Sequence, residues 1–181
     1  SSKDLEGVRL VEDFIKAGID SLKVEGRMKS HHYAGTVSKV YGEALSYYKN
    51  NGHFLSDDLY AWENELCKVS HRDYHSGNLA GKAGADSIFS DREHAESDYS
   101  VAGIVLENNE KSDYMLAEVR SPFFRNSELE LVPFQGPNID IKLSDIFDVT
   151  GESFEKSRPG MIIKLPFIKN ASSYNMLRVK K

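Results

Sequence analysis

The first third of the chain changes hydrophobic period twice. Before residue 18, apolar positions recur at helical spacing, and a cap from Ser2 or Asp4 would start the helix. The apolar positions are Leu5, Val8, Val11, Phe14 and Ile15. Gly18 then ends the pattern as a C-terminal capping glycine. Ser21–Glu25 alternates apolar and polar residues up to Gly26, which predicts a short strand.

Two more helices are predicted after this strand. Ser30 can cap a helix that stops at Asn50-Asn51-Gly52, and a shorter helix is expected over Ser56–Cys67. Helix, strand and helix with short connections make about one and a half turns of a βα repeat. Because a single strand has no neighbour to pair with, we expect its partner strands to lie before Ser1, in a missing N-terminal barrel of the same protein.

The period changes to two after Tyr99. Seven short strands are predicted there, separated by Asn, Gly and Pro turn signals. They cover 101–106, 114–119, 129–134, 139–143, 146–149, 161–165 and 176–179. Such spacing is typical of a closed or nearly closed antiparallel β-barrel. The predicted fold class is α+β, with a (β/α) barrel remnant at 1–78, a linker at 79–98 and a β-barrel domain at 99–181.

Composition limits the setting of the protein. No apolar run among the 181 residues approaches the length of a membrane span, which argues against a membrane partner. Cys67 is the only cysteine, so an intrachain disulfide is excluded and a reducing, cytoplasmic location is expected. The net charge is −5, and neither half has the overall basic charge of an autonomous nucleic-acid-binding domain.

The residues that follow the predicted strand carry the first candidate chemistry. Glu25 and Arg27 are two apart, so an extended backbone would place both on the side that faces a barrel's active-site mouth. This pair could bind a polar ligand, or it could be a structural ion pair that fixes the turn. Lys29 and His31 lie at the start of the next helix, whose free N–H groups could bind an anion.

A second candidate group follows the third predicted helix. Cys67, His71 and His75 recur every four residues, a spacing that could suit a metal on one helical face. A helix that ends near Ser70 would scatter them, so no metal site is assigned.

The segment Ala17-Gly-Ile-Asp-Ser-Leu-Lys-Val-Glu-Gly-Arg-Met-Lys-Ser-His-His-Tyr33 resembles a signature of the collagenase-like peptidases, peptidase family U32. The preceding Ser2-Lys-Asp-Leu5 and the later Ser70-His-Arg-Asp-Tyr-His-Ser-Gly77 resemble further family segments. After Gly77 the likeness departs, because Asn78-Leu79 replaces an aromatic residue. The resemblance is strong over residues 2–77 and diffuse over 98–181.

The resemblance implies the C-terminal part of a U32 protein, with a β-domain similar to the small β-barrel of translation elongation factors. It implies catalytic roles for Glu25, Arg27, His71 and Arg72, and substrate binding by Lys29 and Tyr33. Some relatives take part in hydroxylation of tRNA or rRNA uridines, and some carry an iron–sulfur cluster on cysteines upstream of this region. Any cluster is therefore expected in a longer parent protein, and so is any enzyme activity.

Two other functions remain open at this point. The β-domain could be a non-catalytic module that binds RNA or protein, with Phe123-Phe124-Arg125 and Phe134 as a stacking platform. An extracellular collagenase-like protease is the third alternative. It lacks a recognisable nucleophile in this sequence.

Overall fold

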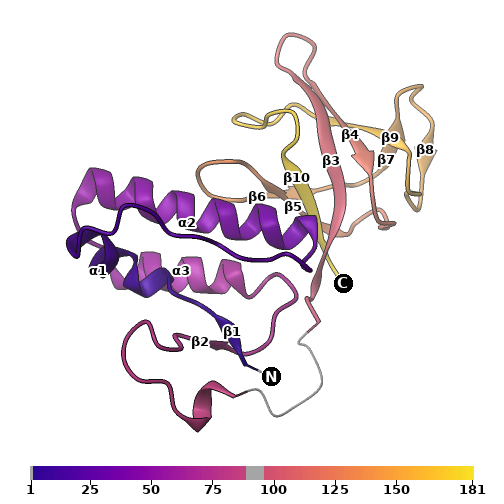
Figure 1. Cartoon of the computed structure of the whole chain (residues 1–181). Helices are drawn as coiled ribbons and strands as arrows, with labels where there is room; N and C mark the ends of the chain where they lie inside the picture. Colours follow the sequence, from indigo (N-terminus) through magenta and orange to yellow (C-terminus); the bar gives the residue numbers. More distant parts are fainter. Residues whose placement is uncertain (1, 89–95) are drawn as a thin grey trace. The chain divides into compact units, whose positions relative to one another are not determined.

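The computed structural model describes residues 2–88 and 96–181 (Figure 1). The chain divides into two compact units, Ser1–Ser97 and Asp98–Lys181. The first unit contains the helices, and the second is a single antiparallel sheet. The predicted α+β class is confirmed.

The first unit combines three α-helices with a short parallel strand pair. In chain order its elements are β1 (Asp4–Leu5), η1 (Val8–Leu10), α1 (Val11–Lys16), α2 (His31–Asn51), α3 (Ser56–Leu66), β2 (Tyr74–His75) and η2 (Ala85–Ser87). Strand β1 pairs with β2 in parallel, with Asp4 opposite Tyr74 and Leu5 opposite His75. This pair joins the start of the unit to the segment that follows α3 (Figure 1).

The predicted first helix begins later than expected. Asp4 and Leu5 lie in β1, where the Asp4 N–H donates to Asp73 O at 3.1 Å. The first helical turn begins only at Val8, and the Asp4 carboxylate accepts the Lys29 ammonium and the Arg72 N–H, so Asp4 does not cap the helix. The C-terminal end of α1 agrees with the prediction, since Gly18 has φ of +73° and its N–H donates to Ile15 O at 3.0 Å.

The predicted strand over Ser21–Glu25 does not form. These residues have no regular secondary structure and pair with no strand in the described parts of the chain. An alternating pattern becomes a strand only where a neighbour accepts its backbone hydrogen bonds, and the first unit offers none here. The segment instead runs alongside α2 (Figure 1).

The two longer helices follow the sequence signals closely. Ser30 Oγ accepts the Tyr33 N–H at 3.2 Å at the start of α2, and Gly52 ends it with φ of +75°. Helix α3 begins at Ser56 as predicted. The helices pack around Trp62, whose ring makes edge-on contact with Phe54 at 5.0 Å. This core also contains Val8, Val37, Val40, Ala44 and Leu66.

The second unit is an eight-stranded antiparallel sheet that curls into a half-barrel. Its strands are β3 (Tyr99–Asn109), β4 (Tyr114–Val119), β5 (Glu128–Val132), β6 (Ile139–Lys142), β7 (Ile146–Asp148), β8 (Ser153–Phe154), β9 (Ile162–Pro166) and β10 (Met176–Lys180). Their order across the sheet is β6-β5-β10-β3-β4-β9-β7-β8. All seven predicted strands are present, whereas β8 is too short to leave a period-two signal.

One continuous core fills the inside of the curled sheet. Its fully buried residues come from most of the strands, and they include Ala102, Val105, Met115, Ala117, Leu131, Ile146 and Leu177. Gly103 lets β3 approach β4 closely, because a Cβ there would lie 2.6 Å from Glu118 O. The side chains on the inner face of the sheet are thus buried against other strands of the same unit.

The predicted linker falls partly within the first unit. Ser87 O accepts the Lys3 N–H at 3.1 Å, and Asp86 pairs with His75 at 2.9 Å, so residues 79–88 pack on that unit. Residues 89–95 of the predicted linker lie outside the described residues. In the described ranges, none of the helices has the length and apolar character that crossing a membrane requires.

Candidate functional site

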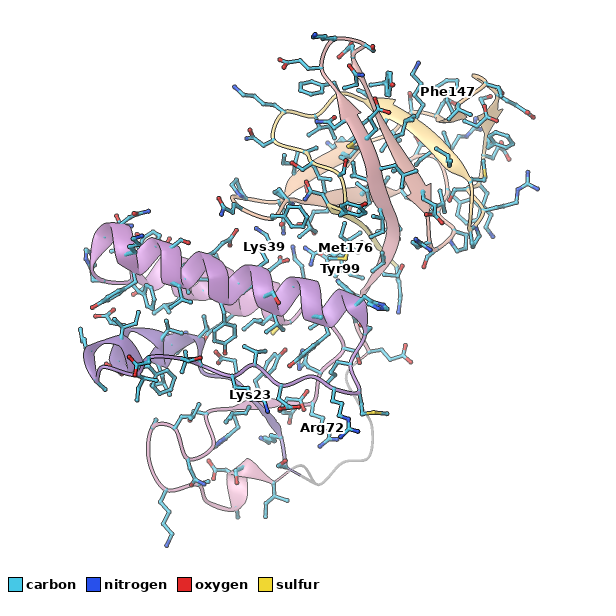
Figure 2. All side chains as sticks on the ribbon, turned by 45° about the horizontal axis from the view of Figure 1, so that its top comes forward. Lys23, Lys39, Arg72, Tyr99, Phe147 and Met176 are labelled. Carbon is cyan, nitrogen blue, oxygen red and sulfur yellow. The ribbon has the colours of Figure 1, made fainter. Side chains whose placement is uncertain are left out.

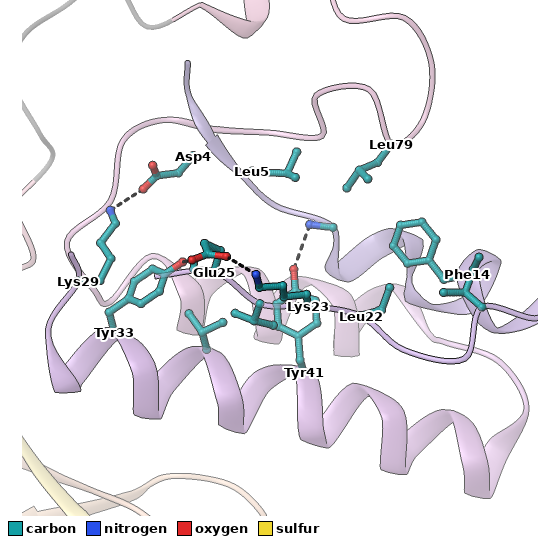
Figure 3. A pocket seen from close by; sticks show the side chains of 14 residues that line it. Asp4, Leu5, Phe14, Leu22, Lys23, Glu25, Lys29, Tyr33, Tyr41 and Leu79 are labelled. Carbon is teal, nitrogen blue, oxygen red and sulfur yellow. Dashed lines mark hydrogen bonds and ion pairs between the residues drawn. The ribbon is translucent and has the colours of Figure 1, made fainter. Parts of the chain in front are cut away.

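A pocket of about 380 Å³ opens in the first unit (Figure 3). It lies between β1, the irregular segment after α1, and one face of α2. Most of its wall is apolar, formed by Leu5, Phe14, Ile19, Leu22, Val24, Val37 and Leu79. Asp4, Lys29, Tyr33 and Glu25 make one end polar. A mainly apolar cavity with a few convergent polar groups is typical of a small-molecule binding site.

Asp4 is the centre of the polar end. Its Oδ2 accepts the Lys29 ammonium at 2.6 Å and the Arg72 backbone N–H at 3.1 Å. One carboxylate therefore joins β1, the turn before α2 and the segment that enters β2. Because the Asp4 side chain is only 18% exposed, solvent screens this ion pair less than a surface pair.

Lys29 is held from several sides. Its Nζ also donates to Ser70 O at 3.4 Å and lies 5.3 Å from the centroid of the Tyr33 ring (Figure 3). The Tyr33 hydroxyl in turn donates to Glu25 O at 3.4 Å. These contacts fix a cation at the pocket without leaving it exposed, which is the arrangement expected of a preorganised polar group.

The ionisation of the site follows from these contacts. Burial of Asp4 alone would raise its pKa, but hydrogen bonds from Lys29 and the Arg72 N–H and the charges of both residues lower the pKa overall. Burial raises the pKa of the Tyr33 hydroxyl, and the Asp4 charge adds to that rise. The polar end therefore holds an ionised carboxylate beside a neutral phenol at neutral pH.

Gly26 is required by the close approach of Tyr33. A Cβ at residue 26 would lie 2.5 Å from Cε1 of the Tyr33 ring. The turn that follows closes with a 2.8 Å hydrogen bond from the Lys29 N–H to Gly26 O. This turn brings Lys29 back over the first residues of α2, which explains the glycine within the Glu-Gly-Arg segment.

The predicted pair of Glu25 and Arg27 is not formed. The Glu25 carboxylate is exposed and pairs with Lys23 at 3.1 Å, and the exposed Arg27 has no ion pair within the part of the chain that the structure describes. The turn after Gly26 ends the extended backbone, so a spacing of two no longer places both side chains on one side. The extended backbone on which the shared face was predicted is therefore absent, and Glu25 still lines the pocket.

His71 and Arg72 lie in the segment between α3 and β2, where Figure 2 labels Arg72. The His71 ring stacks on Tyr74 with centroids 4.2 Å apart, and its Nδ1 donates to Arg72 O at 2.6 Å. The Arg72 guanidinium donates to Ser2 O at 2.9 Å. Arg72 thus reaches the site through its backbone N–H on Asp4, and neither side chain lines the pocket.

The residues with possible metal-ligand spacing do not gather. Cys67 caps the end of α3, while His75 donates to Asp86 at 2.9 Å and accepts the Gly77 N–H at 2.8 Å. Within residues 2–88 and 96–181, no three His, Cys, Asp or Glu side chains are placed to hold a metal ion. One cysteine also does not fit an iron–sulfur cluster, which needs several thiolate ligands.

Asp4 and Tyr41 are the site residues that the sequence interpretation missed. Asp4 was present in the segment resembling the family, but its position before an apolar periodic run favoured a helix cap. Tyr41 lies within α2, where the sequence gives no sign of a polar role, and its hydroxyl accepts the Gly7 N–H at 3.0 Å beside the pocket. Only the pairing of β1 with β2 reveals that Asp4 faces Lys29.

Comparisons with known proteins match nearly the whole chain to one family. A model of peptidase family U32 matches residues 1–88, and a model of the family's C-terminal domain matches residues 97–178. The C-terminal domain of a U32 protein from Geobacillus thermoleovorans has a crystal structure that is 24% identical, with a TM-score of 0.41. The match covers 45% of this chain and 92% of that one.

Curated relatives fall into two named groups. The tRNA hydroxylation protein P1 of Bacillus subtilis is 30% identical over 100% of this chain and 43% of its own length. The tRNA hydroxylation protein P of Escherichia coli is 29% identical over 84% of this chain and 33% of its own. A collagenase of Porphyromonas gingivalis is 30% identical over 45% of this chain and 22% of its own. The chain spans less than half the length of these relatives.

Proposed function

Because the chain belongs to peptidase family U32, we propose that it forms the C-terminal part of a protein that acts in tRNA hydroxylation. The observation that carries this proposal is the share of the chain that aligns with each group of relatives. The similarity to a tRNA hydroxylation protein extends over 100% of the chain, whereas the similarity to a collagenase covers 45%. In this proposal the first unit forms part of the active site, and the second unit binds the RNA. The single cysteine favours a cytoplasmic setting, where tRNA is available.

The pocket supports the role of the first unit. Its apolar wall includes Ile19, Leu22 and Val24, which are exposed in this structure. A barrel built with the remaining residues of the full-length protein would cover this wall and enclose the polar end, as a parallel barrel requires. The Lys29 ammonium would then meet the polar edge of a uridine base or of a co-reactant. An iron–sulfur cluster, where the full-length protein has one, would be held outside these 181 residues.

The proposal is tested with the full-length protein in a bacterial strain that lacks its own tRNA hydroxylation proteins. Mass spectrometry of digested tRNA measures hydroxylated uridine. We expect the wild-type protein to restore the modification and Lys29→Met to lower it by at least about tenfold, because a preorganised charge at the site is lost. Lys49→Met is the matched control, since Lys49 is exposed in the last turn of α2 and away from the pocket.

The outcomes separate two parts of the proposal. A wild-type protein that restores no modified uridine would remove the tRNA hydroxylation function. Full restoration by Lys29→Met, with protein levels equal to wild type, would instead remove the pocket from the reaction.

A peptidase is the second candidate, because collagenases are among the relatives. Incubation of the full-length protein with gelatin tests it, with Glu25→Ala as the variant of the acidic pocket residue. Cleavage by the wild type that is lost in Glu25→Ala would favour the peptidase. Uncut gelatin, together with restored tRNA modification, would leave tRNA hydroxylation as the function.

A further inference from the structure

The acidic and basic residues of the second unit are unevenly distributed along its sequence. Every acidic residue of this unit lies at or before Glu155. Residues 156–181 contain no Asp or Glu and carry Lys156, Arg158, Lys164, Lys169, Arg178, Lys180 and Lys181. The small net charge of this half hides a strongly basic final segment. A local basic segment can attract a polyanion even where the whole domain is near neutral.

Several of these cations lie over aromatic rings. Lys156 Nζ is 4.8 Å from the Phe124 ring centroid, the Arg158 guanidinium carbon is 5.8 Å from that of Phe154, and Lys164 Nζ is 5.4 Å from that of Tyr114. Such pairs occur about once per 70–80 residues in proteins. Finding three such pairs among residues 156–164 marks a concentration of the two group types that contact nucleic acids.

Phe124 is the most accessible of these rings, with 57% of the residue exposed. Its backbone is fixed by the neighbouring segment around the buried Ser157. The Phe123 N–H donates to Ser157 Oγ at 2.9 Å, and the Ser157 N–H donates to Phe123 O at 2.9 Å. The Arg125 N–H donates to Glu155 O at 2.9 Å. An exposed ring on a fixed backbone is a preorganised stacking surface, because little ordering is needed on binding.

The neighbouring residues show which parts of the predicted platform are suited to binding. Phe123 is 3% exposed and belongs to the core, and Arg125 is neutralised by Glu155 at 3.0 Å. Lys156 and Arg158 form no ion pair with a carboxylate in the described ranges, so their charges remain available. The platform expected from the sequence therefore changes. Phe124 is retained with Lys156 over its ring, and Arg158 lies two residues further along, over the Phe154 ring. Phe123, Arg125 and Phe134 are left out, since no cation lies over the Phe134 ring in the described residues.

We propose that Phe124, Lys156 and Arg158 form a binding surface for unpaired RNA. A base stacks on the Phe124 ring, and Lys156 and Arg158 bind the adjacent phosphates. Single-stranded nucleic acid offers both a planar ring that can stack and a neighbouring negative charge, which matches an exposed ring beside unneutralised cations. The inference rests on the proposed function in tRNA hydroxylation and names the surface through which that substrate docks.

The test measures binding of the purified full-length protein to a labelled single-stranded RNA oligonucleotide by fluorescence anisotropy. We expect Phe124→Leu to weaken binding by about tenfold, because a leucine keeps apolar volume but cannot stack with a base. Lys156→Ala should weaken binding and lower the slope of log affinity against log salt by about 0.7, the value for one phosphate contact on a single strand. Phe134→Leu is the matched control, since Phe134 is 61% exposed and no cation lies over its ring in the described residues.

Heparin, a polyanion without bases, separates stacking from charge. We expect Lys156→Ala to weaken heparin binding and Phe124→Leu to leave it unchanged. Equal RNA affinities of Phe124→Leu and Phe134→Leu, or no RNA binding at low salt, would overturn the proposal. Because binding is measured without hydroxylation, this result is independent of the complementation assay. If the protein restores tRNA modification but Phe124→Leu does not change RNA affinity, the proposed RNA-binding surface is wrong and the tRNA hydroxylation function stands.

Discussion

The two units differ in how completely each buries its own apolar residues. In the second unit, Leu131, Ile146 and Leu177 are fully buried inside one sheet. In the first unit, Leu5 is 61% exposed and Val24 is 49% exposed beside the pocket. An antiparallel sheet closes its core with its own neighbouring strands, whereas parallel strands need cover on both faces. Among its described residues the first unit has one parallel strand pair of two residues each, which leaves the pocket face open.

This difference indicates which unit contributes most to stability and which carries the candidate functional site. The second unit resembles a complete small domain, in which loss of volume from the core is costly. The open face of the first unit carries the polar end of the pocket and the segment that resembles the family signature. The apolar residues on that face are thus expected to matter more for the proposed reaction than for the stability of this chain.

The largest expected effect contrasts two leucines. Leu177→Ala should lower the free energy of unfolding of the second unit by about 3 kcal/mol, because it leaves a cavity in a closed core. Leu22→Ala, at a residue 38% exposed on the pocket wall, should change the stability of the first unit by less than about 0.5 kcal/mol. Urea denaturation measures both values.

The two units can be followed separately. Trp62 is the only tryptophan and belongs to the first unit, so its fluorescence reports that unit, while hydrogen exchange of β10 amides reports the second. Comparable losses of unfolding free energy in Leu22→Ala and Leu177→Ala would show that the pocket wall is a closed core. The contrast between an open first unit and a closed second unit would then be wrong.

The second unit was the more predictable of the two from sequence. Some of its strands alternate exposed and buried residues, as in β9 (Ile162–Pro166), and this alternation is visible in the sequence. In the first unit, the caps of α2 were also local signals at Ser30 and Gly52. The same period-two pattern over Ser21–Glu25 failed, because a strand depends on a partner that no local pattern supplies.

The candidate site was predicted only in part for a related reason. Lys29 and Tyr33 lie one turn apart at the start of α2, so a local segment places them together. Asp4 is 25 residues from Lys29, and its contact depends on the pairing of β1 with β2. The link from Asp4 to Arg72 spans 68 residues. Contacts of that range follow from topology, which spacing along the chain does not reveal.

The next prediction concerns Asp4, which joins three segments of the first unit. Asp4→Asn should lower the free energy of unfolding of that unit by about 1–2 kcal/mol, since it removes the charged partner of Lys29 but keeps an acceptor for the Arg72 N–H. Trp62 fluorescence in urea measures the loss. Asp20→Asn, at an exposed residue of the same unit, is the control and should change stability little. An Asp4→Asn variant as stable as Asp20→Asn would show that the Asp4–Lys29 pair does not hold the unit together.

The smallest expected effect is the dependence of this loss on pH. The pKa of Asp4 in the folded protein lies below its ordinary value of 3.8, so folding favours the ionised carboxylate. Its contribution to stability is complete above about pH 4 and is lost as the pH falls through the lowered pKa. The stability difference between wild type and Asp4→Asn should therefore be constant from pH 7 to about pH 4.5 and shrink below pH 4. Other carboxylates titrate in both variants and cancel in the difference. Urea midpoints of Trp62 fluorescence at several pH values measure it. A stability difference that stays constant down to pH 2.5 would mean that the loss in Asp4→Asn comes from side-chain packing. The charge of Asp4 would then not contribute to the stability of the first unit.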